Sequence, residues 1–463
     1  MKTFSINTLG CKVNQYESQQ IRELLEKLGL RMAESPEKPD LVVVNTCCVT
    51  HTASAKSRQY IRKARKHNPD AAVVVSGCLP IVDTDELDID GQPQLDGVHL
   101  IRDRADLSAT LTHITGPKAA PSISQRAQVR PANSIKTKNG DKIKHKVATK
   151  PTELPALTCF CGQTRAFLKV QDGCDGYCTY CIVPKARPFV RSKPLEQVLT
   201  EAQSLVKSGH KEIVVTGIFL GAYGMDSVRR KTWPNGQNDR LARLLGRLAK
   251  LPNLDRIRLS SLEPADVTER LLDTLCQHGN IMPHLHLALQ SGSDSVLKRM
   301  CRQYRVAEFV ETVDLLKTRL DRPAITTDII VGFPGETDAD FERTVELAKQ
   351  VGFAKIHVFP YSARKGTAAA EMDRAVGDRI IKERSRILHA LSDELGREYR
   401  SRFLGQTAQV LLESGYPEPA GRAERYFTVA ISNPPRDIEK NKIVEVKHLK
   451  NHKDRMSGYQ ETG

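Results

Sequence analysis

Three cysteines lie within eight residues of the chain, in the spacing C-x3-C-x2-C: Cys174, Cys178 and Cys181. Three thiolates at this spacing can hold one corner of a cubane iron–sulfur cluster, and the loop that carries them must then wrap around it. Because only three ligands are offered, the fourth iron stays open and can bind a small molecule, unlike the four-cysteine clusters of electron-transfer proteins. A zinc knuckle with a distant fourth ligand is the alternative interpretation of this spacing.

The composition is typical of a multidomain globular protein with a basic surface. A chain of 463 residues, 40% of them hydrophobic, is expected to form several domains with ample cores. Apolar runs long enough to span a membrane are missing, and the N-terminus lacks an apolar signal region, so we expect a cytoplasmic protein without membrane contact. The net charge of +15 favours RNA as a partner, although a merely soluble basic protein would carry the same charge.

The first 115 residues alternate between apolar strand patterns and amphipathic helix patterns. We expect strands at 2–8, 41–45 and 71–76 and helices at 15–28 and 52–67. This β–α–β–α–β order predicts a small, open, parallel α/β sheet domain over residues 1–115.

A cysteine follows each of the three expected strands: Cys11, Cys47 and Cys78. Parallel strands end at one edge of a sheet, where ligand sites form, so these three thiols should converge. In a reducing compartment, cysteines are more typical of metal ligands or free thiols than of disulfides. The placement predicts a second three-cysteine cluster with an open iron; three buried structural cysteines are the alternative. Cys48 is ambiguous, because adjacent residues seldom both ligate one site.

The rest of the chain divides into three parts. Residues 116–157 are predicted to be a basic linker that either tracks phosphates or serves as an inert spacer. Residues 158–402 are predicted to form a partial (β/α)6 barrel, with the C-x3-C-x2-C loop after its first strand. Its strands are expected at 167–170, 212–216, 256–260, 284–289, 324–330 and 355–359, with helices at 195–208, 239–250, 267–277, 306–319, 338–350 and 379–398.

Residues 403–463 show only short strand patterns, at 407–413, 423–431 and 442–447, and residues from about 451 look frayed. They predict a small antiparallel β-barrel, a fold that often binds nucleic acid.

The cysteine spacing resembles the signature of radical S-adenosylmethionine (SAM) enzymes, in which an aromatic residue usually precedes the third cysteine, as Tyr180 does here. The resemblance implies that the open iron binds the amino and carboxylate groups of SAM. It also implies that loops after the barrel strands hold the rest of the cofactor. Residues expected to contact SAM or substrate are Tyr180, Thr216, Gly217, Ser261, Glu263, Gln290 and Asp328.

Longer segments resemble the methylthiotransferase family. They are 8–18, 45–47, 77–78, 164–174 and 290–293, and the string Gly-Cys-Lys-Val-Asn-Gln-Tyr-Glu at 10–17 is similar to the MtaB type. The resemblance implies an N-terminal methylthiotransferase domain, a radical SAM domain and a C-terminal TRAM domain. It also favours Cys47 over Cys48 as the cluster ligand.

The same resemblance implies a radical SAM enzyme that adds a methylthio group to C2 of N6-threonylcarbamoyladenosine (t6A) beside the tRNA anticodon, giving ms2t6A. It would use two [4Fe–4S] clusters and SAM, with a low-potential electron donor and a sulfur donor as partners. The cluster of Cys174, Cys178 and Cys181 would serve SAM cleavage, and the cluster of Cys11, Cys47 and Cys78 would present sulfur.

Three alternatives remain at this point. The MiaB type acts on isopentenyladenosine in tRNA, and the RimO type acts on an aspartate of a ribosomal protein. A non-catalytic iron–sulfur or zinc protein that binds RNA belongs to a different functional class.

The sequence departs from the family pattern at Cys48, at Pro188, where glycine is common, and in its long linker. A C-x-C pair, Cys159 and Cys161, has no evident partner set for a metal. Cys276 is expected on the apolar face of a helix, and Cys301 near a helix with basic neighbours. A basic helix can hold phosphates or form a solvated face; its cations are Arg58, Arg62, Lys63, Arg65 and Lys66.

Overall fold

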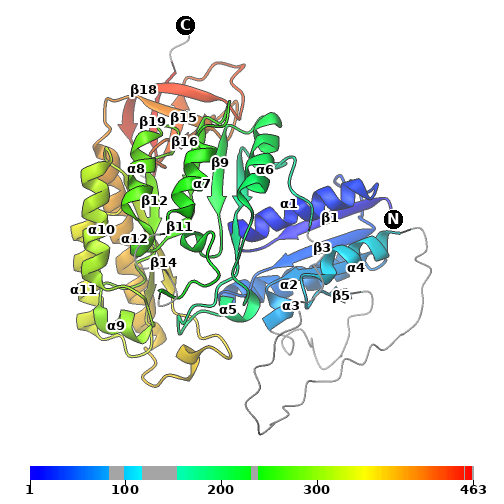
Figure 1. Cartoon of the computed structure of the whole chain (residues 1–463), viewed down its shortest axis with the longest axis horizontal. Helices are drawn as coiled ribbons and strands as arrows, with labels where there is room; N and C mark the ends of the chain where they lie inside the picture. The colour runs from blue at the N-terminus through cyan, green and yellow to red at the C-terminus, as the bar shows by residue number, and fades with distance from the viewer. Residues whose placement is uncertain (83–97, 117–153, 231–237, 453, 461–463) are drawn as a thin grey trace.

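The computed structural model describes residues 1–82, 98–116, 154–230, 238–452 and 454–460. Most of the linker predicted at 116–157 therefore lies outside the described residues, and its predicted role in RNA binding cannot be placed on the fold. Figure 1 shows an N-terminal sheet beside a larger central α/β unit, with a C-terminal β-barrel across one end of that unit.

The N-terminal part is a five-stranded parallel sheet in the order β2–β1–β3–β4–β5. All six residues of β3 are buried, as expected of a central parallel strand covered on both faces. The strands are β1 (Thr3–Thr8), β2 (Arg31–Met32), β3 (Leu41–Thr46), β4 (Ala72–Gly77) and β5 (Val98–Leu100). The helices are α1 (Lys12–Lys27), α2 (His51–His67), α3 (Leu79–Val82) and α4 (Asp106–Thr115). The predicted open parallel sheet is confirmed, with short edge strands added.

The central part contains all six expected barrel strands, but they form two parallel sheets, β10–β9–β6 and β11–β12–β13–β14. The break falls after Leu259, where β10 ends and the short strand β11 pairs with β12 instead. The strands are β6 (Arg165–Lys169), β9 (Glu212–Thr216), β10 (Arg256–Leu259), β11 (Ser261–Leu262), β12 (His284–Leu287), β13 (Ala324–Val331) and β14 (Lys355–Pro360).

Helices cover this central unit at the positions that the apolar periodicity predicts. The long ones are α6 (Leu195–Lys207), α7 (Arg240–Leu248), α8 (Glu269–Gln277), α10 (Val306–Arg319), α11 (Asp338–Val351) and α12 (Asp378–Ser401). Two short helices, α5 (Val183–Ala186) and α9 (Asp294–Arg299), and the strand pair β7 (Gln171–Asp172) with β8 (Arg191–Ser192) complete it. One hydrophobic core runs between the sheets and the helices.

The C-terminal part is a closed five-stranded barrel in the order β15–β16–β17–β19–β18. Its strands are β15 (Ala408–Leu412), β16 (Ala420–Ala423), β17 (Thr428–Ser432), β18 (Ile443–Asn451) and β19 (Met456–Tyr459). The prediction of one strand at 423–431 is wrong, because a turn with Tyr426 at φ +72° divides this segment between β16 and β17. The prediction of frayed residues from 451 is also wrong: Met456 is fully buried, and β19 closes the barrel through a parallel pairing with β17.

The C-terminal barrel sits on the starts of the central strands, away from the cysteine loop. Arg256, the first residue of β10, donates to the carbonyl of Gln409 at 2.7 Å, and Arg258 of the same strand donates to the carbonyl of Ala423 at 2.7 Å. The C-x3-C-x2-C loop follows the other end of β6. An RNA that touched both parts would therefore have to extend along the full length of the central strands.

Helix α1 joins the N-terminal sheet to the central unit. Its Tyr16 is fully buried in the central hydrophobic core, and the Tyr16 hydroxyl accepts a hydrogen bond from Lys193 at 2.8 Å. Gln20 donates to the carbonyl of Pro155 at 2.7 Å, and Gln19 exchanges two hydrogen bonds with the backbone of Cys161. Helix α1 thus belongs to both parts.

Among the described residues, no helix is long and apolar enough to cross a membrane.

Candidate active site

The C-x3-C-x2-C loop lies after β6 and β7, at the carboxyl end of the first central strand. Burial raises the pKa of Cys174 and of Cys181 to about 12, and the charge of the Cys178 thiolate adds to this effect at both. The loop turns back on itself between the second and third cysteines, where the Cys181 N–H donates to the Cys178 carbonyl at 3.0 Å. The Gly176 N–H donates to Cys174 Sγ at 3.3 Å, and Arg302 donates to Cys178 Sγ at 3.0 Å. Such donors favour the thiolate, which is the form that ligates metals.

Arg302 connects this loop to two residues predicted to contact SAM. Its Nη1 lies 3.4 Å from the Tyr180 hydroxyl, and its Nη2 donates to Glu263 Oε1. The second oxygen of Glu263 accepts from Arg230 at 2.8 Å. The structure thus brings Tyr180 and Glu263 to the cysteine loop. Sequence reasoning missed Arg302, because nothing in its local sequence distinguishes it from other arginines of the same region.

The second cysteine set lies where three adjacent parallel strands end. Cys11 begins α1, Cys47 follows β3 and Cys78 follows β4. Burial raises the pKa of Cys47 to about 11, and the nearby charges of Cys78 and Cys11 contribute to this rise. Because β1, β3 and β4 are adjacent and parallel, these three cysteines, separated by up to 67 positions in the sequence, lie at one edge of the sheet.

Two glycines make this close approach possible. A Cβ at Gly10 would lie 2.6 Å from the Cβ of Cys47, and a Cβ at Gly77 would lie 2.3 Å from the carbonyl oxygen of Thr46. Both glycines also have φ above +90°, a conformation that other residues rarely adopt. The Gly-Cys pairs at 10–11 and 77–78 are thus required by packing.

Cys78 has a different electrostatic environment from the other two cysteines of its set. A hydrogen bond from Cys48, together with the charges of Arg187 and Arg104, lowers the pKa of Cys78 to about 5. Arg104 Nη2 lies 3.5 Å from Cys78 Sγ. The buried Cys48, which is not one of the three cysteines of this set, thus stabilises the thiolate of Cys78.

A buried ion network lies between the two cysteine sets, and we call its members Glu17, Lys169, Asp172 and Arg187 the seam network. Arg187 forms two hydrogen bonds of 2.7 Å with Glu17 of α1, and its Nη1 donates to Asp172 at 2.7 Å. Lys169 binds the same two carboxylates, at 3.1 and 2.9 Å. The charges of Arg187 and Lys169 hold both carboxylates ionised. Burial alone would raise the pKa of Glu17, but these two cations outweigh burial and lower this pKa to about 2.

The seam network is also attached to both cysteine sets. The Arg187 carbonyl accepts the N–H of Cys174 at 2.9 Å, and the Arg187 charge lowers the pKa of Cys78, as described above. Ile182 and Ala186 of the α5 segment pack in the same apolar cluster as Cys48 and Cys78. The loops that carry the two cysteine sets therefore face each other across one seam. Sequence reasoning assigned no role to Glu17, Lys169 or Asp172.

Two further residues predicted to contact SAM lie at the end of β9. Thr216 is buried, and the backbone of Gly217 passes so close to Gln171 that a Cβ there would lie 2.9 Å from the amide oxygen. Ser261, in β11, is exposed. The roles of these residues toward SAM stay predictions.

Asp328 lies in β13, and Gln290 follows the neighbouring strand β12 by three residues. Gln290 has φ +68°, and its N–H donates to the carbonyl of Asp328 at 2.8 Å. The Asp328 carboxylate lies 3.2 Å from His286 Nε2, and the ring of His357 lies 5.7 Å from that of His286. Sequence reasoning missed both histidines, which lie on β12 and β14, the two strands that pair with the strand of Asp328.

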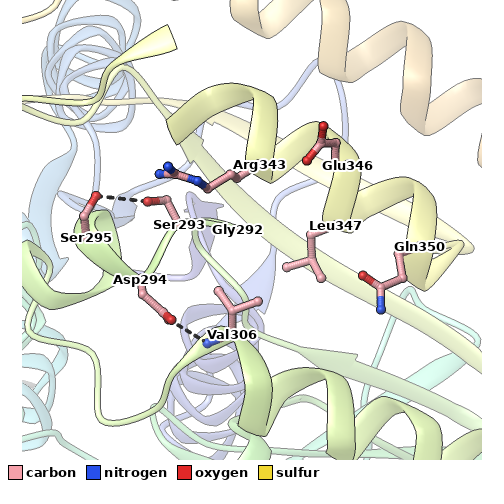
Figure 2. A pocket seen from close by; sticks show the side chains of 9 residues that line it. All are labelled: Gly292, Ser293, Asp294, Ser295, Val306, Arg343, Glu346, Leu347 and Gln350. Atoms are coloured by element: carbon pink, nitrogen blue, oxygen red, sulfur yellow. Dashed lines mark hydrogen bonds between the residues drawn. The ribbon is translucent and has the colours of Figure 1, made fainter. Parts of the chain in front are cut away.

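A surface cavity of about 400 Å³ lies elsewhere, between α9, α10 and α11. Figure 2 shows its polar lining, with Ser293 bonded to Ser295 and Asp294 bonded to the backbone of Val306. None of its lining residues is a cysteine, and the residues after Gln290 turn toward α11, where Gly292 donates to Thr344 at 3.0 Å. We therefore place the candidate active site at the seam.

The other cysteines lie outside the two sets. Cys159 Sγ and Cys161 Sγ are 3.3 Å apart in a turn held by α1. The prediction that Cys276 is on an apolar face is wrong: its side chain is exposed in the last turn of α8. Cys301, which follows α9, is also exposed. Within the described ranges, no three His, Cys, Asp or Glu side chains are placed to hold a single metal ion.

Comparisons with known proteins identify the family. Residues 168–348 match the Radical SAM superfamily, and residues 3–98 match the family described as Uncharacterized protein family UPF0004. The chain is 36% identical to the threonylcarbamoyladenosine tRNA methylthiotransferase MtaB of Bacillus subtilis, over 97% of this chain and 94% of that protein. The chain belongs to the MtaB family of radical SAM methylthiotransferases. Members of this superfamily use a [4Fe–4S] cluster and SAM, so this chain is an enzyme that requires both.

MtaB relatives are not the sole matches. A tRNA-2-methylthio-N(6)-dimethylallyladenosine synthase of Corynebacterium efficiens is 33% identical over 89% of this chain and 75% of that protein. Among solved structures, the radical SAM methyltransferase TsrM of Kitasatospora setae matches with a TM-score of 0.50 and 15% identity, over 77% of this chain and 72% of that chain. This last likeness concerns the fold alone.

Proposed function

We propose that this MtaB-family enzyme adds a methylthio group to C2 of t6A beside the tRNA anticodon, giving ms2t6A. The observation that carries the proposal is the identity to MtaB along nearly the whole chain. Methylthiolation of the isopentenyladenosine class of base is the second candidate, because synthases of that type match at 33% identity.

We assign the SAM-binding cluster to Cys174, Cys178 and Cys181, and an auxiliary [4Fe–4S] cluster to Cys11, Cys47 and Cys78. The donor set fits these groups, because each has three neighbouring thiols and at least one arginine that donates to a sulfur, Arg302 in one set and Arg104 in the other. Together the two clusters and SAM would supply the chemistry that breaks an unactivated aromatic C–H bond and provides sulfur and a methyl group.

Residues around the two cysteine sets hold the cysteine loops in place and neutralise buried charges beside them. Glu263 and Arg302 form a buried ion pair beside Cys178, where SAM is expected to bind. The seam network holds α1, with Cys11 at its start, against the loop that starts at Cys174. Buried surroundings of this kind exclude water, which protects a reactive species.

We infer tRNA as the partner from the net charge of +15 and from the relatives' substrates. Lys56, Arg62, Lys63 and Lys66 are exposed on α2, so this helix offers phosphate contacts beside the seam. A cytoplasmic location, a low-potential electron donor and a separate sulfur donor belong to the same proposal.

A substrate comparison tests the function. The reconstituted enzyme, with SAM and reductant, is given tRNA that contains t6A or tRNA that contains isopentenyladenosine, and the nucleosides are analysed by mass. We expect ms2t6A from the first and no product from the second. Product from isopentenyladenosine alone would replace this proposal with the second candidate.

Cysteine variants test the division of labour. Substitution of Cys11, Cys47 or Cys78 by alanine should abolish methylthiolation but preserve 5′-deoxyadenosine formation from SAM. Cys276→Ala is the matched control, because this cysteine is exposed on α8. Loss of SAM cleavage in the Cys11, Cys47 and Cys78 variants would argue against separate roles for the two clusters.

A further inference from the structure

The two most exposed of the large hydrophobic side chains in the described residues flank the candidate active site. Phe189 is 68% exposed and Tyr177 is 58% exposed. Tyr177 lies inside the C-x3-C-x2-C loop, and Phe189 follows α5 by three residues. Water contact with so much aromatic surface is unfavourable, so exposed rings next to a site indicate a binding partner.

Each ring is paired with an arginine. The Arg229 guanidinium lies 4.2 Å from the centre of the Tyr177 ring, and that of Arg191 lies 5.2 Å from the centre of the Phe189 ring. Arg229 is fixed by a hydrogen bond of 2.8 Å to the carbonyl of Asp175, and it also pairs with the Asp175 carboxylate at 3.4 Å. An aromatic ring with a guanidinium beside it offers a flat surface and a positive charge at one place.

Both rings are attached to the cluster loop through the backbone. A Cβ at Gly173 would lie 1.8 Å from the carbonyl oxygen of Phe189, so the two segments are in direct contact. One residue further on, Cys174 donates its N–H to the carbonyl of Arg187. The rings are thus held at fixed places relative to the cysteines.

We propose that Tyr177 and Phe189 are stacking platforms for unpaired RNA bases next to the target adenosine, with Arg191 facing a neighbouring phosphate. The inference rests on the proposed tRNA substrate. Proteins that bind single-stranded RNA stack bases on aromatic rings and arginine planes in this way, and the target base must leave its stack to reach a buried site. The two aromatic rings would replace the base stacking that the RNA loop loses when the target base leaves its stack. The basic chain favours this occupant over an apolar protein surface.

The test measures the affinity of the reconstituted holoenzyme for an anticodon stem-loop RNA that contains t6A, by fluorescence anisotropy at fixed salt. Phe189→Ala and Tyr177→Ala should each weaken binding about 5- to 100-fold, the range for one stacked base. Tyr177→Phe and Phe189→Tyr keep a ring and should bind within about twofold of the unchanged protein, since the ring face supplies the stacking. Leu404→Ala, an exposed apolar side chain at the other end of the molecule, is the control for lost apolar surface.

The outcomes separate the two proposals. If the unchanged enzyme methylthiolates t6A but Phe189→Ala binds the stem-loop as tightly as Leu404→Ala, the platforms are refuted and the function stands. Slower reduction by a protein electron donor with unchanged RNA affinity would also refute the platforms and assign the rings to that donor. If the unchanged enzyme neither binds nor modifies the RNA, the proposed function fails first.

Discussion

Removal of Arg187 should loosen the contact between α1 and the central unit. Its guanidinium is 1% exposed and carries hydrogen bonds to Glu17, Asp172 and Asn14. Arg187→Met keeps most of the volume but leaves two carboxylates to Lys169 alone. Loss of one partner from a buried ion pair costs about 3–5 kcal/mol, because the other charge stays buried without compensation.

The pKa of Glu17 gives a second measure of the same interaction. Arg187 and Lys169 overcome burial and lower this pKa to about 2, and a pKa lowered by roughly 2 corresponds to about 3 kcal/mol. Since the pKa is lower in the folded protein, this stabilisation is present above about pH 4.3 and is lost as the pH falls toward the folded value. This value is the net of burial and of the neighbouring cations, and it has the same order of magnitude as the cost of losing Arg187.

Hydrogen exchange of the α1 amides, read by mass spectrometry, reports the local opening of this contact. Arg187→Met should speed the exchange of α1 about 100-fold, because each 1.4 kcal/mol is a factor of ten. Arg319→Met is the matched control: Arg319 pairs with Glu269 and Asp273 on the surface, where such a pair is worth about 1 kcal/mol or less. Arg187→Met should also form less methylthiolated tRNA per SAM consumed than the unchanged enzyme.

A double-mutant cycle gives the refutation. Glu17→Gln removes the charge that Arg187 leaves behind, so the double variant should lose about 2 kcal/mol less than the sum of the single variants. Strict additivity, or α1 exchange in Arg187→Met no faster than in Arg319→Met, would show that the seam network does not hold the two parts together.

Two further predictions concern single arginine and lysine side chains. Arg302→Gln removes a charged donor from Cys178 Sγ. A hydrogen bond of about 1.5 kcal/mol corresponds to roughly 60 mV, so the reduction potential of that cluster should become more negative by this amount in an EPR-monitored titration. An unchanged potential would contradict this. Lys12 is the first residue of α1, directly after Cys11. The t6A substituent ends in a carboxylate and the isopentenyl group does not, so Lys12→Gln should reduce kcat/KM for t6A tRNA about tenfold or more. An equal loss on a non-carboxylate substrate would count against this role.

Sequence patterns predicted the elements that local chemistry determines. Buried parallel strands such as β3 are continuous apolar runs, and their following cysteines reveal the second cysteine set because strand ends meet at one edge. The same local logic failed for β19. Its segment is short and polar, and Met456 becomes buried only because the barrel closes around it. A strand that is stabilised mainly by closure of a barrel shows little strand pattern in its own sequence.

The partners of the cysteines could not be predicted, because they come from distant parts of the chain. Arg302 reaches Cys178 across 124 positions and Arg187 reaches Glu17 across 170. Single-sequence periodicity describes which face of an element is buried, but it does not identify the charge on the facing element. A partial signal was present: Glu17 and Glu23 are buried on α1, where a helix at a domain surface would normally expose its carboxylates.

Helix α1 explains why the seam matters for chemistry. Cys11 begins this helix, and Glu17 lies six positions later, about 9 Å along its axis at 1.5 Å per residue. A helix turn transmits displacement with little loss, so a tilt of α1 at Glu17 moves the Cys11 thiol relative to Cys174. The same arginine that binds Glu17 accepts the Cys174 N–H through its carbonyl. Arg187 therefore links the two cysteine sets through its buried side chain and its own backbone, and a variant that alters it should uncouple sulfur transfer from SAM cleavage before it unfolds the protein.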